Sequence, residues 1–200
     1  MAMTLSELNL SLFSHLNAPI NANEWMVNFA IFIANDLLYI LLLSFAFFWF
    51  RGDIAVKTQI IKAFIFTSVA LLIGELISHF FYHPRPFVMH VGRTLIEHAP
   101  NASFPSTHML IFSTIGFAYF FSKQRQLGLD ILLLAWCVAW SRVYLGVHFP
   151  MDMLGAFFLA WAVNLCGLAL WHKYQNRIMQ SILSLHQILF KPLIQKGYIK

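Results

Sequence analysis

Long apolar runs with almost no charge set the strongest limit on what this sequence can fold into. A helix needs about 20 apolar residues to cross the hydrocarbon core of a bilayer. Charged residues make up only 10% of the chain, whereas a soluble domain carries about a quarter. Polar side chains this scarce could not cover the surface of a water-soluble protein. We therefore expect an all-α, polytopic membrane helical bundle. The five expected spans are Trp25–Phe50, Gln59–Tyr82, Phe104–Ser122, Leu127–Leu145 and Met151–Trp171.

The N-terminal segment, residues 1–24, has a different pattern from the spans. Its leucines at positions 5, 8, 12 and 16 recur near helical spacing, and the segment contains no Lys or Arg. An apolar stripe on a short helix is typical of a segment that lies in the plane of the membrane surface. We therefore expect an interfacial amphipathic helix here.

The C-terminal segment, residues 172–200, is basic and amphipathic. We expect it to lie at the membrane interface on the cytoplasmic side. Residues 25–171 then form the transmembrane core, and the length of the chain suits one membrane domain over residues 1–200.

Basic residues are unevenly divided between the two ends of the expected bundle. Cytoplasmic loops carry an excess of Lys and Arg, which places the richer face inside and the N-terminus outside. Only Arg85, Arg93 and Arg142 fall on the outer face, where an anionic ligand would explain them. The other ten of the 13 Lys and Arg residues are Arg51, Lys57, Lys62, Lys123, Arg125, Lys173, Arg177, Lys191, Lys196 and Lys200.

Three short polar stretches fall on this outer face. They are Tyr82–Phe87 at the end of the second span, Ser103–His108 at the start of the third, and Ser141–Asp152 between the fourth and fifth. Connectivity alone places all three at the same membrane depth. We therefore expect their side chains to form one site.

The residue types in these stretches suit a phosphate group. The guanidinium groups of Arg85 and Arg142 can donate paired hydrogen bonds to phosphate oxygens. Ser106 adds a hydroxyl, and the backbone around Ser106 and Thr107 begins a helix, whose free N–H groups bind anions. The pattern therefore predicts a phosphate-binding site.

Two histidines and a carboxylate could supply the chemistry at this site. A neutral His148 has one free ring nitrogen and can act as a nucleophile. If Pro150 begins a helix, Asp152 lies in its first turn and can bind the other ring nitrogen. His108 can then protonate the leaving oxygen as a general acid.

Each residue has a structural alternative when it is taken alone. Arg85 and Arg142 could bind lipid headgroups, Ser106 could only cap a helix, and His108 and Asp152 could be ordinary residues at helix ends. A metal site is a further interpretation, but its spacing matches no standard zinc pattern, so we expect no metal and no cofactor. Its candidate ligands are His79, His83, His90 and His98.

The three stretches resemble the motifs of the lipid phosphate phosphatase (type 2 phosphatidic acid phosphatase) superfamily, which includes the vanadium haloperoxidases. Ser141–Asp152 is similar to its Ser-Arg-x5-His-x3-Asp motif, and Pro105–His108 to its Pro-Ser-Gly-His motif. Arg85-Pro86 is similar to the end of its Lys-x6-Arg-Pro motif. The resemblance covers roughly residues 78–152.

The resemblance implies a role for each matching residue. His148 corresponds to the nucleophile, Asp152 to the acid that orients it, and His108 to the general acid. The implied reaction is metal-independent and passes through a phosphohistidine. The implied phosphate-binding residues are Arg85, Arg142, Ser106 and Thr107.

The sequence departs from the superfamily pattern at two positions. Ser78 stands where the first motif has its lysine, and Thr107 stands in place of the glycine of the second motif. The first change removes a positive charge from the phosphate site. Arg93 is a further candidate to supply it.

A closer resemblance, carried by the stretch from Arg85 to His108, is to the bacitracin-resistance type of undecaprenyl diphosphatase, whose members also tend to lack the first-motif lysine. It implies hydrolysis of undecaprenyl diphosphate to the monophosphate and inorganic phosphate. It also implies a location in the bacterial inner (plasma) membrane, with the active site facing the periplasm or outside.

Two other functions remain open. One is the hydrolysis of another lipid phosphate, such as phosphatidylglycerol phosphate, phosphatidic acid or a lipid A phosphate. The other is a lipid-phosphate binder or transporter without catalysis. The expected partners are a polyprenyl diphosphate lipid and membrane lipids, with no nucleic acid and no obligate protein partner.

Overall fold

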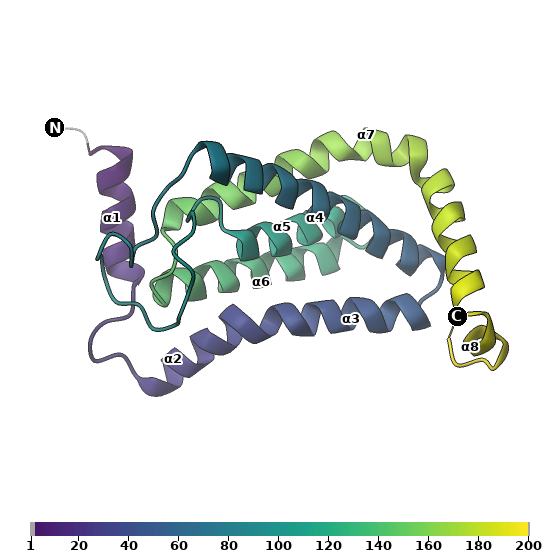
Figure 1. The fold of residues 1–200 in the computed structure, drawn as a ribbon, viewed down its shortest axis with the longest axis horizontal. Coiled ribbons are helices and arrows are strands. Elements are labelled where there is room, and N and C mark those ends of the chain that lie inside the picture. The colour runs from purple at the N-terminus through teal and green to yellow at the C-terminus, as the bar shows by residue number, and fades with distance from the viewer. Residues whose placement is uncertain (1–2, 200) are drawn as a thin grey trace.

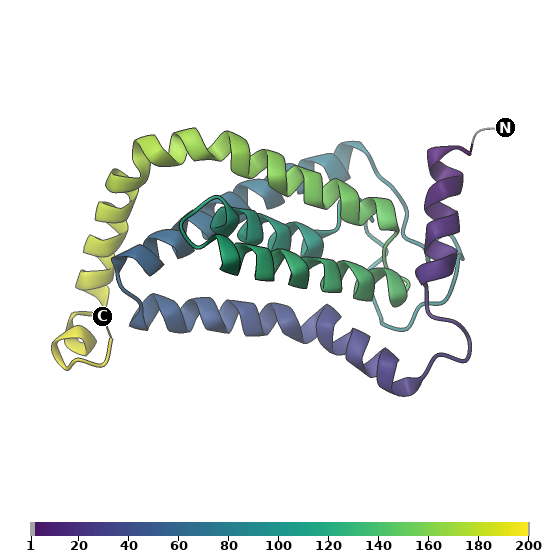
Figure 2. The same cartoon turned by 180° about the vertical axis from the view of Figure 1, so that it is seen from behind.

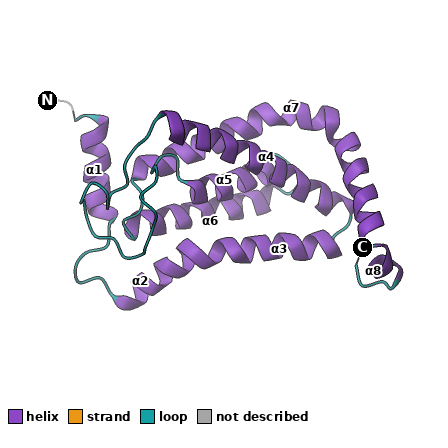
Figure 3. Ribbon diagram, in the orientation of Figure 1, coloured by secondary structure: helices purple, strands orange, loops and turns teal. Residues whose placement is uncertain are grey.

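The computed structural model describes residues 3–199, and this part of the chain is helical and contains no strand (Figures 1 and 3). The all-α membrane bundle expected from the sequence is therefore confirmed. The elements in order are α1 (Leu5–Leu16), α2 (Glu24–Ile31), the π-helical turn η1 (Phe32–Asp36), α3 (Leu37–Arg51), α4 (Ile54–Phe80), α5 (Thr107–Phe120), α6 (Arg125–Tyr144), α7 (Pro150–Leu189) and α8 (Lys191–Gln195).

Helices occupy all five expected spans, but they differ in length. The rod formed by α2, η1 and α3 is long and apolar enough to cross a membrane, and so is each of the helices α4, α6 and α7. Helix α5 has 14 residues, or about 21 Å, against a hydrocarbon core of about 30 Å. It begins at Thr107 rather than Phe104 because Pro105 disfavours helical backbone in the residue before it.

Two other boundaries differ from the expected ones. Helix α4 begins at Ile54, before the expected Gln59, because Asp53 caps it by accepting a hydrogen bond from the backbone of its first turn. Helix α7 continues past the expected end at Trp171 to Leu189, since the chain between these two residues has neither Pro nor Gly. At 40 residues it spans about 60 Å, and it bends round the end of the bundle toward α8 (Figure 2).

Helix α5 is the centre of the bundle. It packs against α4, α6 and α7, and its side chains from Met109 to Tyr119 are almost all buried, whereas α3 buries none. Helices α5 and α6 approach closely at Gly128, where a Cβ atom would lie 2.2 Å from the backbone nitrogen of Phe120. Small residues at such contacts let helix backbones pack together in a membrane.

Helix α1 covers the end of the bundle where the long loops gather (Figure 1). Phe13 is fully buried, with its ring centroid 5.1 Å from that of Phe149. The Asn9 side chain accepts a hydrogen bond of 3.0 Å from the backbone N–H of Met151. The expected amphipathic helix is present, and its buried face packs against the start of α7, while Leu12 remains exposed.

The close approach at Gly128 predicts the effect of a larger side chain there. Gly128→Val places new atoms against the backbone of Phe120 and should lower the free energy of unfolding by about 1–3 kcal/mol. Leu129→Val, at an exposed neighbouring position, is the matched control. Thermal unfolding of both variants in detergent tests this, and equal midpoints would contradict the packing described.

Candidate active site

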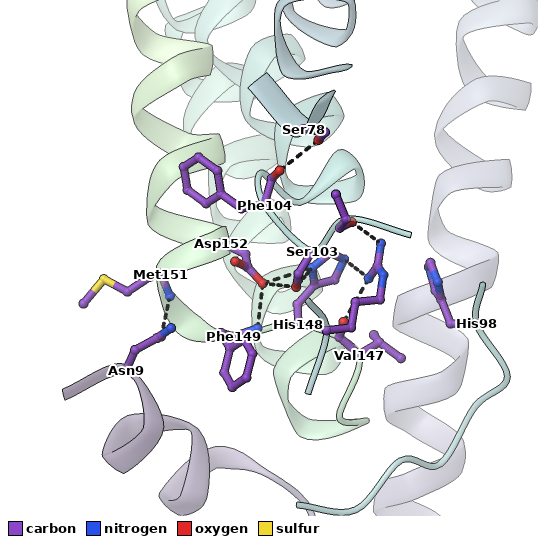
Figure 4. Close-up of polar contacts among 12 residues, drawn as sticks. Asn9, Ser78, His98, Ser103, Phe104, Val147, His148, Phe149, Met151 and Asp152 are labelled. Atoms are coloured by element: carbon purple, nitrogen blue, oxygen red, sulfur yellow. Dashed lines mark hydrogen bonds and ion pairs between the residues drawn. The ribbon is translucent and has the colours of Figure 1, made fainter. Parts of the chain in front are cut away.

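The three polar stretches expected to meet do lie together at the end of the bundle next to α1, and Figure 4 shows Ser103 beside His148 and Asp152. Backbone hydrogen bonds hold them in place. The N–H of Ser103 donates to the carbonyl of His83 over 2.8 Å, and the N–H of Ser106 donates to the carbonyl of Asp152 over 3.3 Å. The loop after α4, the start of α5 and the start of α7 therefore form one framework.

His148 lies in the turn between α6 and α7, with only 2% of its surface exposed. Its Nδ1 atom is 3.3 Å from Oδ2 of Asp152 and 3.3 Å from the Ser103 hydroxyl. The same Asp152 oxygen accepts hydrogen bonds from the Ser103 hydroxyl and from the backbone of Phe149. Because Pro150 begins α7, Asp152 lies in its first turn, and these contacts fix the carboxylate behind the imidazole.

The protonation state of His148 follows from its neighbours. The Nη1 atom of Arg85 lies 3.0 Å from Nε2 of His148. Because a guanidinium nitrogen can only donate, Nε2 is the acceptor and Nδ1 carries the proton. Burial lowers the pKa of His148 to about 4, although the Asp152 carboxylate opposes this shift. The ring is therefore neutral at pH 7, with its Nε2 lone pair directed away from Asp152.

The guanidinium group of Arg85 joins two loops. It donates to the side chain of Asn101 (2.9 Å) and the carbonyl of Ala102 (3.1 Å) in one loop, and to the carbonyl of Val147 (2.9 Å) in the other. Burial lowers the pKa of Arg85 to about 10, with the charge of Asp152 opposing. Arg85 is therefore still charged at neutral pH, next to the free nitrogen of His148.

Several buried donors of the same polar stretches have no partner among residues 3–199. The hydroxyl of Ser106 and the Nε and one terminal nitrogen of Arg142 make no hydrogen bond there. Buried polar atoms are nearly always paired, so these groups are the ones a bound oxyanion would satisfy. Thr107 follows as the first residue of α5, where backbone N–H groups have no partner within the helix.

His108 and His98 lie beside the same cluster. His108 is the second residue of α5 and is close enough to Arg142 for the charge of its guanidinium group to act on the imidazole. The rings of His98 and His148 are 6.3 Å apart (Figure 4). Burial lowers the pKa of His98, and the positive charges of Arg85 and Arg142 add to the shift.

The structure does not direct the Arg93 guanidinium into this cluster. It donates to the carbonyls of Pro19 and Ile20, at 2.9 Å each, while the Arg93 backbone pairs with the side chain of Asn17. Arg93 therefore ties the segment after α1 to the loop after α4.

Ser78 occupies the lysine position of the first motif without replacing its charge. Its hydroxyl donates to the carbonyl of Phe104 over 2.8 Å, so it anchors the loop that carries Ser103. The role of Ser103 itself was missed from the sequence. Its proximity to His148 and Asp152 depends on how that loop folds, and no spacing rule indicates it.

The four histidines considered as metal ligands, His79, His83, His90 and His98, are not grouped as a metal site. Within residues 3–199, no three His, Cys, Asp or Glu side chains are grouped so that they could hold a metal ion. The metal interpretation therefore finds no support in this geometry.

The arrangement suits attack on an electron-poor phosphorus. A neutral imidazole nitrogen is aimed away from the carboxylate that orients it, and the guanidinium group of Arg85 lies against it. Preorganised donors around a developing charge are the usual means of stabilising such a transition state.

Comparisons with known proteins agree with this geometry. The chain is 36% identical over 98% of its length to YbjG of Escherichia coli strain K12, a candidate undecaprenyl-diphosphatase by name, and covers 99% of that protein. It is 29% identical to undecaprenyl-diphosphatase BcrC of Bacillus subtilis strain 168, over 76% of this chain and 79% of BcrC. It is 31% identical to the bacitracin transport permease protein BcrC of Bacillus licheniformis, over 90% and 95% of the two chains.

The fold is also that of a solved structure. LpxE of Aquifex aeolicus superposes with a TM-score of 0.68 at 22% identity, over 84% of this chain and 99% of LpxE. A family model for the PAP2 superfamily matches residues 60–178, which is the stretch that holds α5, α6, the start of α7 and the whole cluster around His148. This chain is therefore a lipid phosphatase of the membrane that belongs to the PAP2 superfamily.

Proposed function

We propose that this protein hydrolyses undecaprenyl diphosphate to undecaprenyl phosphate and inorganic phosphate, through a phosphohistidine at His148. The observation that carries the proposal is the neutral His148, held from behind by Asp152, in a cluster of stretches that also carry the unpaired buried donors of Ser106 and Arg142. The names of the Escherichia coli and Bacillus subtilis relatives support the choice of lipid.

In the first step, Nε2 of His148 attacks the terminal phosphorus and the bond to the bridging oxygen breaks. Arg85 transfers its hydrogen bond from Nε2 to a phosphate oxygen, which frees the nucleophile. Arg142, Ser106 and the start of α5 hold the other oxygens. His108 gives its proton to the leaving undecaprenyl phosphate.

In the second step, water attacks the phosphohistidine. His108, now neutral, accepts a proton from this water, and the bond between phosphorus and Nε2 breaks. The electron pair returns to His148, and inorganic phosphate leaves. Throughout, Asp152 and Ser103 hold the Nδ1 proton and stabilise the ring while it is positively charged.

The apolar tail of the substrate has a place to lie on the bundle. A groove of about 410 Å³ runs between α3, α4, α5 and α6, and its walls are almost entirely hydrocarbon. Helix α3, which forms one wall of the groove, buries none of its side chains. The groove runs from Phe112, near the start of α5, to Val56 and Gln124 at the end of the bundle away from His148. It can therefore hold a distal part of a long prenyl chain while the diphosphate reaches His148.

The main alternatives share parts of this argument. Another lipid phosphate would use the same donors and nucleophile, and only the tail and headgroup would differ. A binder or transporter without catalysis would have no need of an oriented nucleophile, although the Bacillus licheniformis relative is named a bacitracin transport permease protein. The pairing of His148 with Asp152 therefore favours the enzyme.

The first prediction concerns catalysis by His148. The purified protein in detergent with EDTA should release phosphate from undecaprenyl diphosphate, and His148→Ala should lower the rate at least about 10³-fold because it removes the nucleophile. His15→Ala, an exposed histidine on α1, is the control and should match the wild type.

Other outcomes of this assay would contradict parts of the proposal. Faster release from phosphatidylglycerol phosphate or phosphatidic acid in a competition assay would overturn the choice of lipid. Release that EDTA abolishes would overturn the metal-independent mechanism. Full activity of His148→Ala would overturn the phosphohistidine.

A second prediction tests Ser103 as a positioning residue. Ser103→Ala removes the hydroxyl that contacts both Asp152 and His148, and a hydrogen bond to a charged group is worth about 1.5–3 kcal/mol. We expect kcat to fall about 10- to 100-fold, with little change in KM, and Ser103→Thr should restore most of the rate. Ser113→Ala, at a buried hydroxyl outside the site, is the control; an unchanged kcat for Ser103→Ala would disprove the role.

We also propose that this site faces the periplasm or outside of a bacterial inner membrane, as the uneven distribution of Lys and Arg supports. With Cys137 and Cys166 replaced by Ser, an impermeant maleimide applied to intact cells should label Met89→Cys, an exposed position beside the site. Arg125→Cys, at the start of α6, should react only after the membrane is opened. The reverse pattern would invert the orientation.

A further inference from the structure

A second polar cavity lies at the opposite end of the bundle from His148. It has a volume of about 410 Å³ and lies between the first half of α4, the turn that joins α5 to α6, and the second half of α7. His172, which lines the cavity, lies about 33 Å along α7 from the start of that helix. The cavity is therefore remote from the active site. Its principal polar residues are Gln59, Lys62, Lys123, Gln124, His172 and Gln175.

Lys62 brings a buried positive charge to this cavity. Its side chain is 2% exposed, and its ammonium group donates to the carbonyl of Ala118 over 2.8 Å. An ammonium group has three N–H donors, and no carboxylate pairs with Lys62 in residues 3–199. A buried charge is costly without a counter-ion, and with Lys123 also lining the cavity and no acidic residue among its walls, an anion would supply one.

Gln59 provides an independent sign of a ligand. Its side-chain oxygen is buried and has no hydrogen-bond partner in residues 3–199, although the residue lines the same cavity. Buried polar atoms rarely stay unpaired. A ligand that carries a hydroxyl group next to its anionic group would satisfy both Gln59 and Lys62.

An apolar groove continues from the polar cavity. It has a volume of about 420 Å³ between α4 and α7, and Trp171 lines both spaces. Its wall on α7 runs from Leu159 past Trp171 to Ile178. The stretch from Leu159 to Trp171 is about 18 Å long, close to half of a hydrocarbon core of about 30 Å. A polar cavity joined to such a groove has the shape of a lipid from one leaflet.

We propose that the cavity and the groove form a binding site for an anionic glycerophospholipid of the leaflet opposite the active site. The phosphate lies between Lys62 and Lys123, a headgroup hydroxyl donates to Gln59, and an acyl chain lies along α4 and α7. Basic pockets between membrane helices bind anionic headgroups in this way. The site is separate from the catalytic one and does not depend on the proposed reaction.

Lipid binding to the full-length protein in detergent tests the proposal, with native mass spectrometry as the readout. Phosphatidylglycerol should bind about tenfold more tightly than phosphatidylcholine, because it has a net negative charge and a headgroup hydroxyl, whereas the choline cation offsets the phosphate charge and has no hydroxyl to donate. Lys62→Met, which keeps the length of the side chain without its charge, and the exposed Lys123→Gln should each remove most of this preference. Lys196→Gln, at an exposed lysine outside the cavity, should bind as the wild type does.

Two further experiments distinguish a bound lipid from a bound free anion. Ala162→Phe, which fills the groove, should weaken phosphatidylglycerol binding, and inorganic phosphate at millimolar concentration should not displace the lipid. Displacement by phosphate together with normal binding to Ala162→Phe would show a free-anion site and overturn the proposal. Equal binding of the two lipids, or normal binding to both lysine variants, would overturn it as well. Because these readouts need no turnover, they stand apart from any result on undecaprenyl diphosphate.

Discussion

The buried charge of Arg85 is the constraint around which the active site is organised. A guanidinium group taken out of water is costly unless its N–H groups are paired. Here the loop after α4 and the turn before α7 both bring acceptors to it, including the free nitrogen of His148. The same contacts therefore close the two loops on each other and hold His148, the proposed nucleophile, in place.

The short, enclosed helix α5 gives this arrangement its position. It is surrounded by α4, α6 and α7, and only its N-terminal end meets the loops that carry Arg85 and His148. A helix N-terminus attracts anions, so a buried α5 directs its dipole at the space in front of His148. The close backbone contact at Gly128 fixes its depth relative to α6, which carries Arg142.

The two ends of the bundle use buried cations differently. At the candidate active site, Arg85 and Arg142 lie near His148, the proposed nucleophile, and the carboxylate of Asp152, so the proposal has an anion react there. At the opposite end, Lys62 lies beside amides and an apolar groove, with no nucleophile and carboxylate pair in its walls, so an anion there can only be held. The surrounding groups, rather than the positive charge, separate catalysis from binding.

Much of the fold could be predicted from the sequence, because the bilayer restricts the choice. Apolar runs of helix length can only be helices in a membrane, and connectivity then brings the three polar stretches to one end. Within that limit, the spacing from Arg142 through His148 to Asp152 was enough to place a histidine against a carboxylate. The continuous α7 was missed because composition changes near Trp171, although no residue there breaks a helix.

The sequence by itself determined the helical class, the end of the bundle at which the site forms, and the residue types that meet there, since these depend on local hydropathy and order along the chain. Only the tertiary structure decided that Ser103 supports His148 and Asp152, that Ser78 anchors a loop, that Arg93 binds the segment after α1, and that Lys62 is buried. These contacts join residues far apart in sequence, and they depend on how loops and helices pack, which no local pattern encodes.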